Sequence, residues 1–177
     1  MNQADSTGSG VIEALHVSGP SPEHADKLMQ FGQFVGSWCV QWSGTGNDGQ
    51  PLQVEGELHF GWVLGGRAVQ DTWIVPGRNQ PRDPRMRAFH GTTVRFYDAR
   101  IDGWRSTWIE PINARVRRFI GRPADGQIIL LSDEEDPWLR WRFTDIRPRS
   151  ALWIGEISYD RGATWIQEEQ MHLTRLT

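Results

Sequence analysis

The stretch Phe34-Val35-Gly36-Ser37-Trp38-Cys39-Val40-Gln41-Trp42-Ser43 decides the fold class. From Trp38 onward, apolar and polar side chains alternate, which is the period-two pattern of a β-strand with one buried face. Residues 54–62 repeat this pattern as Val-Glu-Gly-Glu-Leu-His-Phe-Gly-Trp. The turn signal Asn47-Asp48-Gly49 lies between the two runs, so together they predict an antiparallel hairpin.

Further runs of the same kind follow, and short turn signals separate them. They are residues 67–75, 89–97, 104–110, 114–121, 127–132, 139–146, 151–159 and 164–173. About ten strands joined mostly by hairpins predict an all-β protein built as an antiparallel meander. At this length we expect the meander to close into a barrel of about 8–10 strands, which leaves no exposed sheet edge. Residues 76–87 form a Pro- and Arg-rich loop long enough to be a lid or a rim.

The chain before the first strand carries one predicted helix. Ser21 can cap a helix, Pro22 suits the first turn and Glu23 favours the helix dipole, so a short helix is predicted from Ser21 to Gly32. Residues 1–20 are rich in Ser, Gly and Asp without a sustained period, and predict a disordered leader. Residues 21–177 are then expected to form a single domain. The leader has neither a basic segment nor a long apolar one, so we expect no signal peptide.

The composition narrows the classes of function. The 177 residues include 19 basic and 22 acidic side chains, and this near balance argues against a nucleic-acid groove. A single Cys, Cys39, excludes an intramolecular disulfide and a four-thiolate zinc site. No apolar run approaches the roughly 20 residues of a membrane helix. We therefore expect a cytoplasmic protein that binds neither nucleic acid nor membrane.

The entry into the first strand, Gly36-Ser37-Trp38, resembles the G-x-W signature of the lipocalin and calycin barrels. In those folds the Trp closes one end of the barrel and an Arg near the last strand packs across it, and Arg175 is placed for that role. The order of short helix, G-x-W strand and meander is similar over most of residues 21–177. The phrases at 65–71, 91–98 and 141–146 resemble an uncharacterised bacterial group of lipocalin-like barrels. The resemblance implies a cup that holds a small molecule, and it implies no particular ligand.

If Trp38 points into the barrel, the heavier apolar face of each strand can be assigned to the inside. This assignment places eight of the ten tryptophans inside, namely Trp38, Trp42, Trp62, Trp73, Trp104, Trp108, Trp141 and Trp165. Trp138 and Trp153 fall outside. The assignment also traps six polar side chains: Asp71, His90, Glu110, Arg118, Glu156 and Glu169. A buried carboxylate is costly unless it is paired, protonated or hydrated, so this set predicts a hydrated pocket or acids with raised pKa. Some of these residues could instead lie at strand ends.

The leading hypothesis is a binding protein for a small hydrophobic or aromatic ligand. Trp73, Trp108 and Trp141 would provide flat walls. Glu110, Arg118 and Glu169 would fix the orientation of the ligand. The alternative is that the tryptophans simply fill the interior of a small barrel.

A second hypothesis is an enzyme that uses the same cavity for cyclisation, isomerisation or hydration of a small hydrophobic substrate. Asp71 or Glu156 would act as general acid or base, and His90 would be its partner. The sequence has no nucleophile elbow, phosphate loop or dinucleotide fingerprint, so it gives no support to acyl-transfer, kinase or NAD chemistry.

A third hypothesis is a nitrobindin-like haem protein, because such barrels resemble this plan and hold iron through a His late in the chain. His172 is the candidate in the last strand, but it directly follows Met171 and is therefore expected to point outward. No His pair has the spacing of a local metal site, so we expect no metal and no cofactor. An exposed Trp such as Trp153 could support a homodimer.

Overall fold

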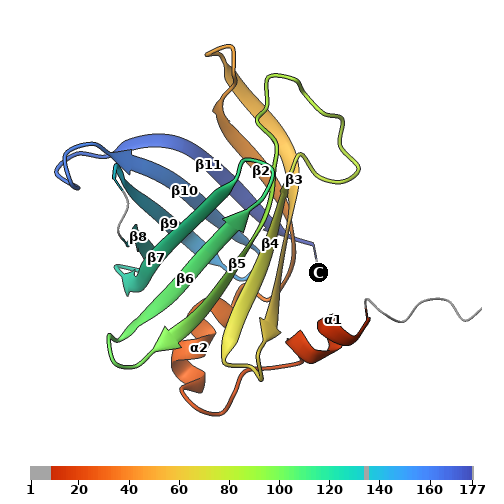
Figure 1. Ribbon diagram of the computed structural model, residues 1–177, viewed down its shortest axis with the longest axis vertical. Coiled ribbons are helices and arrows are strands. Elements are labelled where there is room, and N and C mark those ends of the chain that lie inside the picture. Colours follow the sequence, from red (N-terminus) through yellow and green to blue (C-terminus); the bar gives the residue numbers. More distant parts are fainter. Residues whose placement is uncertain (1–8, 134–135, 177) are drawn as a thin grey trace, which may run out of the picture.

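The computed structural model describes residues 9–133 and 136–176 (Figure 1). Ten antiparallel strands of this part of the chain form a closed barrel, in which each strand pairs with the next along the chain and the last pairs with the first. Their bounds are β2 (Gly36–Thr45), β3 (Pro51–Val63), β4 (Ala68–Val75), β5 (Phe89–Asp98), β6 (Gly103–Glu110), β7 (Arg115–Ala124), β8 (Gln127–Ser132), β9 (Trp138–Arg147), β10 (Ser150–Ser158) and β11 (Ile166–Arg175). The all-β meander and its closure are therefore confirmed.

The strands begin and end where the turn signals predict. Asp125 and Gly126 form the two-residue turn between β7 and β8, with φ of 50° and 75°. Positive φ at both positions is what a type I′ turn requires, and its twist matches that of the flanking strands. Local turn chemistry and the period of two together specify a meander.

The amino-terminal segment differs from the expected leader and helix. Residues 1–8 lie outside the described residues, whereas Ser9–Leu15 form α1 and His16–Val17 form β1, which pairs with the end of β3. The second helix, α2, covers Ala25–Gly32 and does not begin at Ser21. Ser21 instead accepts a hydrogen bond from the Glu23 N–H within a turn, so its predicted role as the helix cap is wrong. Neither described helix has the length and apolar composition needed to cross a membrane.

The helix α2 lies at one end of the barrel (Figure 1). Aromatic side chains close this end. Phe31 and Phe34 are buried there, and the Trp38 indole N–H donates to the Phe34 carbonyl oxygen at 2.7 Å. The Arg175 guanidinium lies 4.2 Å from the centre of the Trp38 ring and donates to the Val35 carbonyl oxygen. The expected closure by a Trp and a late Arg is therefore confirmed.

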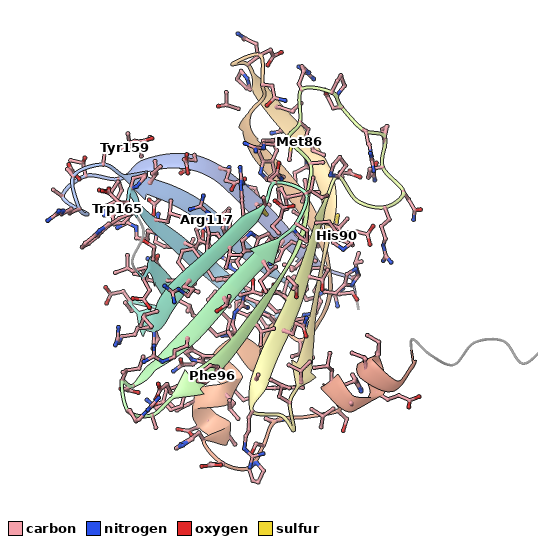
Figure 2. The ribbon with its side chains drawn as sticks, in the orientation of Figure 1. Met86, His90, Phe96, Arg117, Tyr159 and Trp165 are labelled. Atoms are coloured by element: carbon pink, nitrogen blue, oxygen red, sulfur yellow. The ribbon has the colours of Figure 1, made fainter. Side chains whose placement is uncertain are left out.

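Burial confirms the predicted inner face of six of the described strands, β2, β3, β4, β6, β9 and β11. On β5 the assignment is wrong, because Gly91, Thr93 and Arg95 are buried while His90 and Phe96 project outward (Figure 2). Thr93 lies opposite the buried Asp71 of β4, and residues opposite each other in a sheet point to the same side.

The assignment is also wrong on β7 and β10. On β7 Phe119 is buried, whereas Val116 and Arg118 are exposed on the outer face. On β10 Trp153 is buried and its ring contacts those of Trp73 and Trp141, so Leu152, Ile154 and Glu156 face the other way. Trp165 also lies outside, where the Arg140 guanidinium stacks 4.2 Å from its ring centre. The predicted positions of Trp153 and Trp165 are thus exchanged.

Candidate functional site

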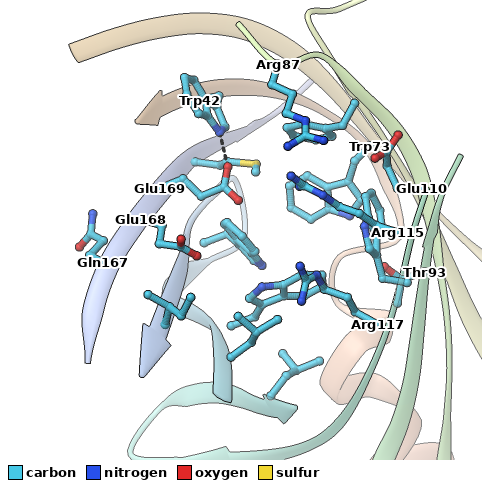
Figure 3. A pocket seen from close by; sticks show the side chains of 18 of the residues that line it. Trp42, Trp73, Arg87, Thr93, Glu110, Arg115, Arg117, Gln167, Glu168 and Glu169 are labelled. Atoms are coloured by element: carbon cyan, nitrogen blue, oxygen red, sulfur yellow. Dashed lines mark hydrogen bonds between the residues drawn. The ribbon is translucent and has the colours of Figure 1, made fainter. Parts of the chain in front are cut away.

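A cavity of about 550 Å³ occupies the half of the barrel away from α2 (Figure 3). Ligand pockets in proteins have volumes of roughly 300–1,000 Å³, so this space suits a small organic molecule. Among the described residues, five tryptophans line it: Trp42, Trp73, Trp108, Trp141 and Trp153. The alternative from the sequence was that the tryptophans fill the interior of the barrel. The cavity shows that side chains do not fill it completely.

Four of these tryptophans, Trp73, Trp153, Trp141 and Trp108, form a continuous aromatic wall. The Trp141 ring lies 4.1 Å from the Phe119 ring and 5.4 Å from the Trp153 ring, centre to centre. Trp108 meets Trp141 edge to face at 6.1 Å, and Trp73 lies 5.8 Å from Trp153. Such tilted contacts are favourable and hold each ring in place, so the wall is formed before any ligand arrives. The sequence predicted three of these rings, Trp73, Trp108 and Trp141, and missed Trp153.

The mouth of the cavity carries opposite charges on its two sides. Arg87, Arg115 and Arg117 extend from one side, and Glu168 and Glu169 extend from the other (Figure 3). The sequence had placed Val116 and Arg118 of β7 inside the barrel. The structure has the opposite face of β7 inside, so Arg115 and Arg117 line the cavity. The expected anchor Arg118 is exposed on the outer face of the same strand.

Residues 76–88, which connect β4 to β5, lie beside this mouth. Met86 and Arg87 line the cavity, and Asn47 of the β2–β3 hairpin donates its backbone N–H to the Arg85 carbonyl oxygen at 2.8 Å. Arg78 at the other end of the loop donates to the Glu57 carboxylate of β3 at 2.7 Å. These contacts hold the loop against the hairpin, so it forms part of the rim.

Glu169 is one of the acids that line the cavity. It accepts a hydrogen bond from the Trp42 indole N–H at 2.5 Å. Burial raises the pKa of Glu169, and the neighbouring Glu168 adds to the rise. The hydrogen bond from Trp42 and the charges of Arg115 and Arg117 oppose the rise without cancelling it. The predicted acid with a raised pKa is therefore present at this position.

Glu169→Gln is expected to change how stability depends on pH. The folded state holds the Glu169 proton more tightly than the unfolded state, so the stabilisation is present below the ordinary pKa of 4.5 and is lost as the pH rises through the raised folded pKa. A Gln side chain has no proton to lose in this range, so the variant does not lose stability in this way. Its amide oxygen can still accept the hydrogen bond from the Trp42 indole N–H. The free energy of unfolding of the variant, relative to wild type, should grow by about 1.4 kcal/mol for each pH unit across that window.

Urea denaturation from about pH 4 to about pH 8 measures this difference. Thr107→Val is the control, because it changes an uncharged side chain on the outer side of β6 and no titratable group. Its difference from wild type should stay constant with pH. A constant difference for Glu169→Gln as well would contradict a raised pKa at Glu169.

Glu110 lines the cavity, but its carboxylate serves the turn that follows. Its oxygens accept hydrogen bonds from the backbone N–H of Ile112 at 2.8 Å and from the Asn113 side-chain amide at 2.8 Å. Its side chain is buried at 1% exposure. The described hydrogen bonds of Glu110 fix the β6–β7 turn. Its expected contact with a ligand stays a prediction.

Asp71 and Arg95 form a buried ion pair at the inner end of the cavity. Their exposed fractions are 1% and 2%, and the Arg95 Nη2 donates to the Asp71 Oδ2 at 2.5 Å. The Thr93 backbone N–H donates to the other oxygen, Oδ1, at 3.0 Å. Burial raises the pKa of Asp71, while Arg95 and Thr93 oppose the rise. Both oxygens of the carboxylate are thus engaged by protein groups.

The three residues expected to be catalytic do not come together. Asp71 is inside, His90 is exposed on the outer face of β5, and Glu156 lies under Arg140 and Arg142 on the outer face of β9 and β10. Burial alone would raise the pKa of Glu156, but hydrogen bonds from Arg140 and Arg142 outweigh it and lower the pKa.

His172 is exposed on the outer face of β11, as predicted from its place after Met171. In residues 9–133 and 136–176 no group of three or more His, Cys, Asp or Glu side chains could hold a metal ion.

Comparisons with known proteins agree with the architecture. No family model and no curated protein matches the chain. The crystal structure of Rv2717c from M. tuberculosis is similar with a TM-score of 0.59 and 12% identity, over 89% of this chain and 99% of that one. The S-type phycobiliprotein lyase CPES from Guillardia theta is similar with a TM-score of 0.53 and 13% identity, over the same shares, 89% and 99%. At these identities the likeness shows the fold, a lipocalin-like barrel.

Proposed function

We propose that this protein binds a small hydrophobic ligand with an aromatic ring system in the tryptophan-lined cavity. The observation that carries the proposal is a space of about 550 Å³ walled by five tryptophans within the described residues. Flat apolar walls favour a flat apolar ligand, and the charged mouth keeps the opening hydrated.

Binding is better supported than acid–base catalysis. Asp71 and Glu156 both have their oxygens engaged by protein donors, and His90 is on the opposite side of the sheet from the cavity. A general acid must reach the substrate atom that it protonates. The residues expected to share that chemistry do not share a space.

The test is a fluorescence titration with N-phenyl-1-naphthylamine, a neutral aromatic probe. Excitation of the tryptophans should sensitise the probe, because a molecule in the cavity lies against several indoles. Trp141→Ala should weaken binding by about tenfold, since an aromatic contact and its buried area contribute about 1.4 kcal/mol.

Trp165→Ala is the matched control, because it removes the same side chain from the outer face. Its affinity for the probe should equal that of wild type. Failure of wild type to bind the probe would overturn the proposal, and so would an equal loss of affinity in the two variants.

A further inference from the structure

Four buried polar atoms lack a hydrogen-bond partner among the described residues, and they lie together. They are Thr93 Oγ1, Arg95 Nε, Arg95 Nη1 and Ser106 Oγ. Ser106 of β6 lies opposite Arg95 of β5, and Thr93 is two residues away on the same face. Thr93 and Arg95 also line the cavity. Since buried polar groups are almost always hydrogen-bonded in proteins, this cluster marks a place for a polar atom from outside the chain.

The surroundings of Arg95 hold its guanidinium in one position. The Asp71 carboxylate binds Nη2, while the Phe31 ring lies 4.5 Å and the Phe60 ring 5.6 Å from the guanidinium carbon. The two nitrogens without partners, Nε and Nη1, are therefore fixed in position, and so is the direction of their N–H groups. Donors fixed in advance bind an acceptor without the entropy cost of ordering a flexible side chain.

The chemistry of the cluster selects an oxygen acceptor. Arg N–H groups can only donate, and the hydroxyls of Thr93 and Ser106 can donate as well. Asp71 already neutralises Arg95, so a carboxylate entering this buried place would bring a second, unpaired negative charge. A neutral carbonyl oxygen satisfies the donors without that charge.

We propose that the inner end of the cavity is a subsite for a neutral carbonyl oxygen, held by Thr93 and Arg95 with Ser106 beside them. The inference rests on the proposed function and narrows the ligand to planar aromatic carbonyl compounds. Such a ligand enters with its carbonyl end first and its ring system between the tryptophans. The charged mouth then lies at the other end of the ligand.

The test compares three fluorescent naphthalenes that differ at one position. They are 6-propionyl-2-(dimethylamino)naphthalene, its 6-propyl analogue, in which a CH₂ group replaces the carbonyl, and 6-(dimethylamino)-2-naphthoate. Wild type should bind the propionyl compound roughly tenfold tighter than the propyl compound, because hydrogen bonds from charged donors are strong. The infrared C=O stretch of the bound ketone should shift to lower wavenumber.

Thr93→Val removes one donor and keeps the side-chain shape. It should lose part of the preference for the ketone and bind the propyl compound as wild type does. Thr107→Val, on the outer side of β6, is the matched control and should keep the full preference.

Each contrary result has a separate meaning. Equal affinity for the ketone and the propyl compound overturns the carbonyl subsite and leaves the proposed function standing. Tighter binding of the naphthoate overturns the neutral acceptor in favour of an anion site. Failure of all three compounds to bind wild type overturns the proposed function, and the subsite falls with it.

Discussion

Asp71→Ala is expected to lower the free energy of unfolding by about 3–5 kcal/mol. The substitution leaves the Arg95 guanidinium buried at 2% exposure without its counter-charge. It also removes the acceptor of the Thr93 backbone N–H. Urea denaturation at neutral pH measures the loss, which is a large part of the roughly 5–15 kcal/mol that stabilises a typical domain.

The control is the double variant Asp71→Leu with Arg95→Met. Apolar side chains of similar size can replace a buried ion pair with little loss, so this variant should be much more stable than Asp71→Ala. A loss below about 1 kcal/mol for Asp71→Ala would mean that the pair is exposed to water, contrary to the structure.

Trp153→Ala is expected to cost about 3–5 kcal/mol of stability, because it opens a large hole in the aromatic wall. Trp153 is 4% exposed and touches the rings of Trp73 and Trp141. Trp165→Ala should cost about 1 kcal/mol, since it removes a stacking contact with Arg140 on the outer face. Urea denaturation of the two variants measures both losses.

This pair of variants tests directly which of the two tryptophans lies inside the barrel. Placing the more apolar face of each predicted strand inside put Trp165 inside the barrel and Trp153 outside. A larger loss for Trp165→Ala than for Trp153→Ala would restore that assignment and contradict the structure.

The strands themselves could be predicted from the sequence because their signals are local. Alternation at period two and turn residues such as Asp125-Gly126 act over a few neighbouring residues. The closure by Trp38 and Arg175 followed from a resemblance carried by the G-x-W stretch. The start of α2 was misplaced because Ser21 and Pro22 also suit a turn.

The inner face of β5, β7 and β10 could not be predicted by weighing apolar residues. Val94 and Phe96 occupy an outer face, as apolar side chains often do, while Arg95 is inside because Asp71 on β4 faces it. That pairing depends on the register between strands. The glycine at position 91 also depends on the neighbouring strand. A Cβ there would lie 2.5 Å from the Trp108 ring of β6, so only a residue without a side chain fits.

The candidate site was predicted only on strands whose inner face was assigned correctly. Trp73, Trp108, Trp141 and Glu169 all lie on such strands and all line the cavity. Arg95, the residue that carries the carbonyl subsite, was missed. The apolar residues Val94 and Phe96 put the opposite face of β5 inside, so the face that carries Gly91, Thr93 and Arg95 was assigned to the outside.

The measurement that tests the central claim most directly is a crystal structure of the complex with N-(4-bromophenyl)-1-naphthylamine. Anomalous scattering locates the bromine without reference to the rest of the ligand. We predict a bromine peak inside the barrel, among Trp73, Trp108 and Trp141. A peak confined to the outer hollow between Leu28, Leu64 and Phe96, or no peak from a saturated crystal, would contradict the account.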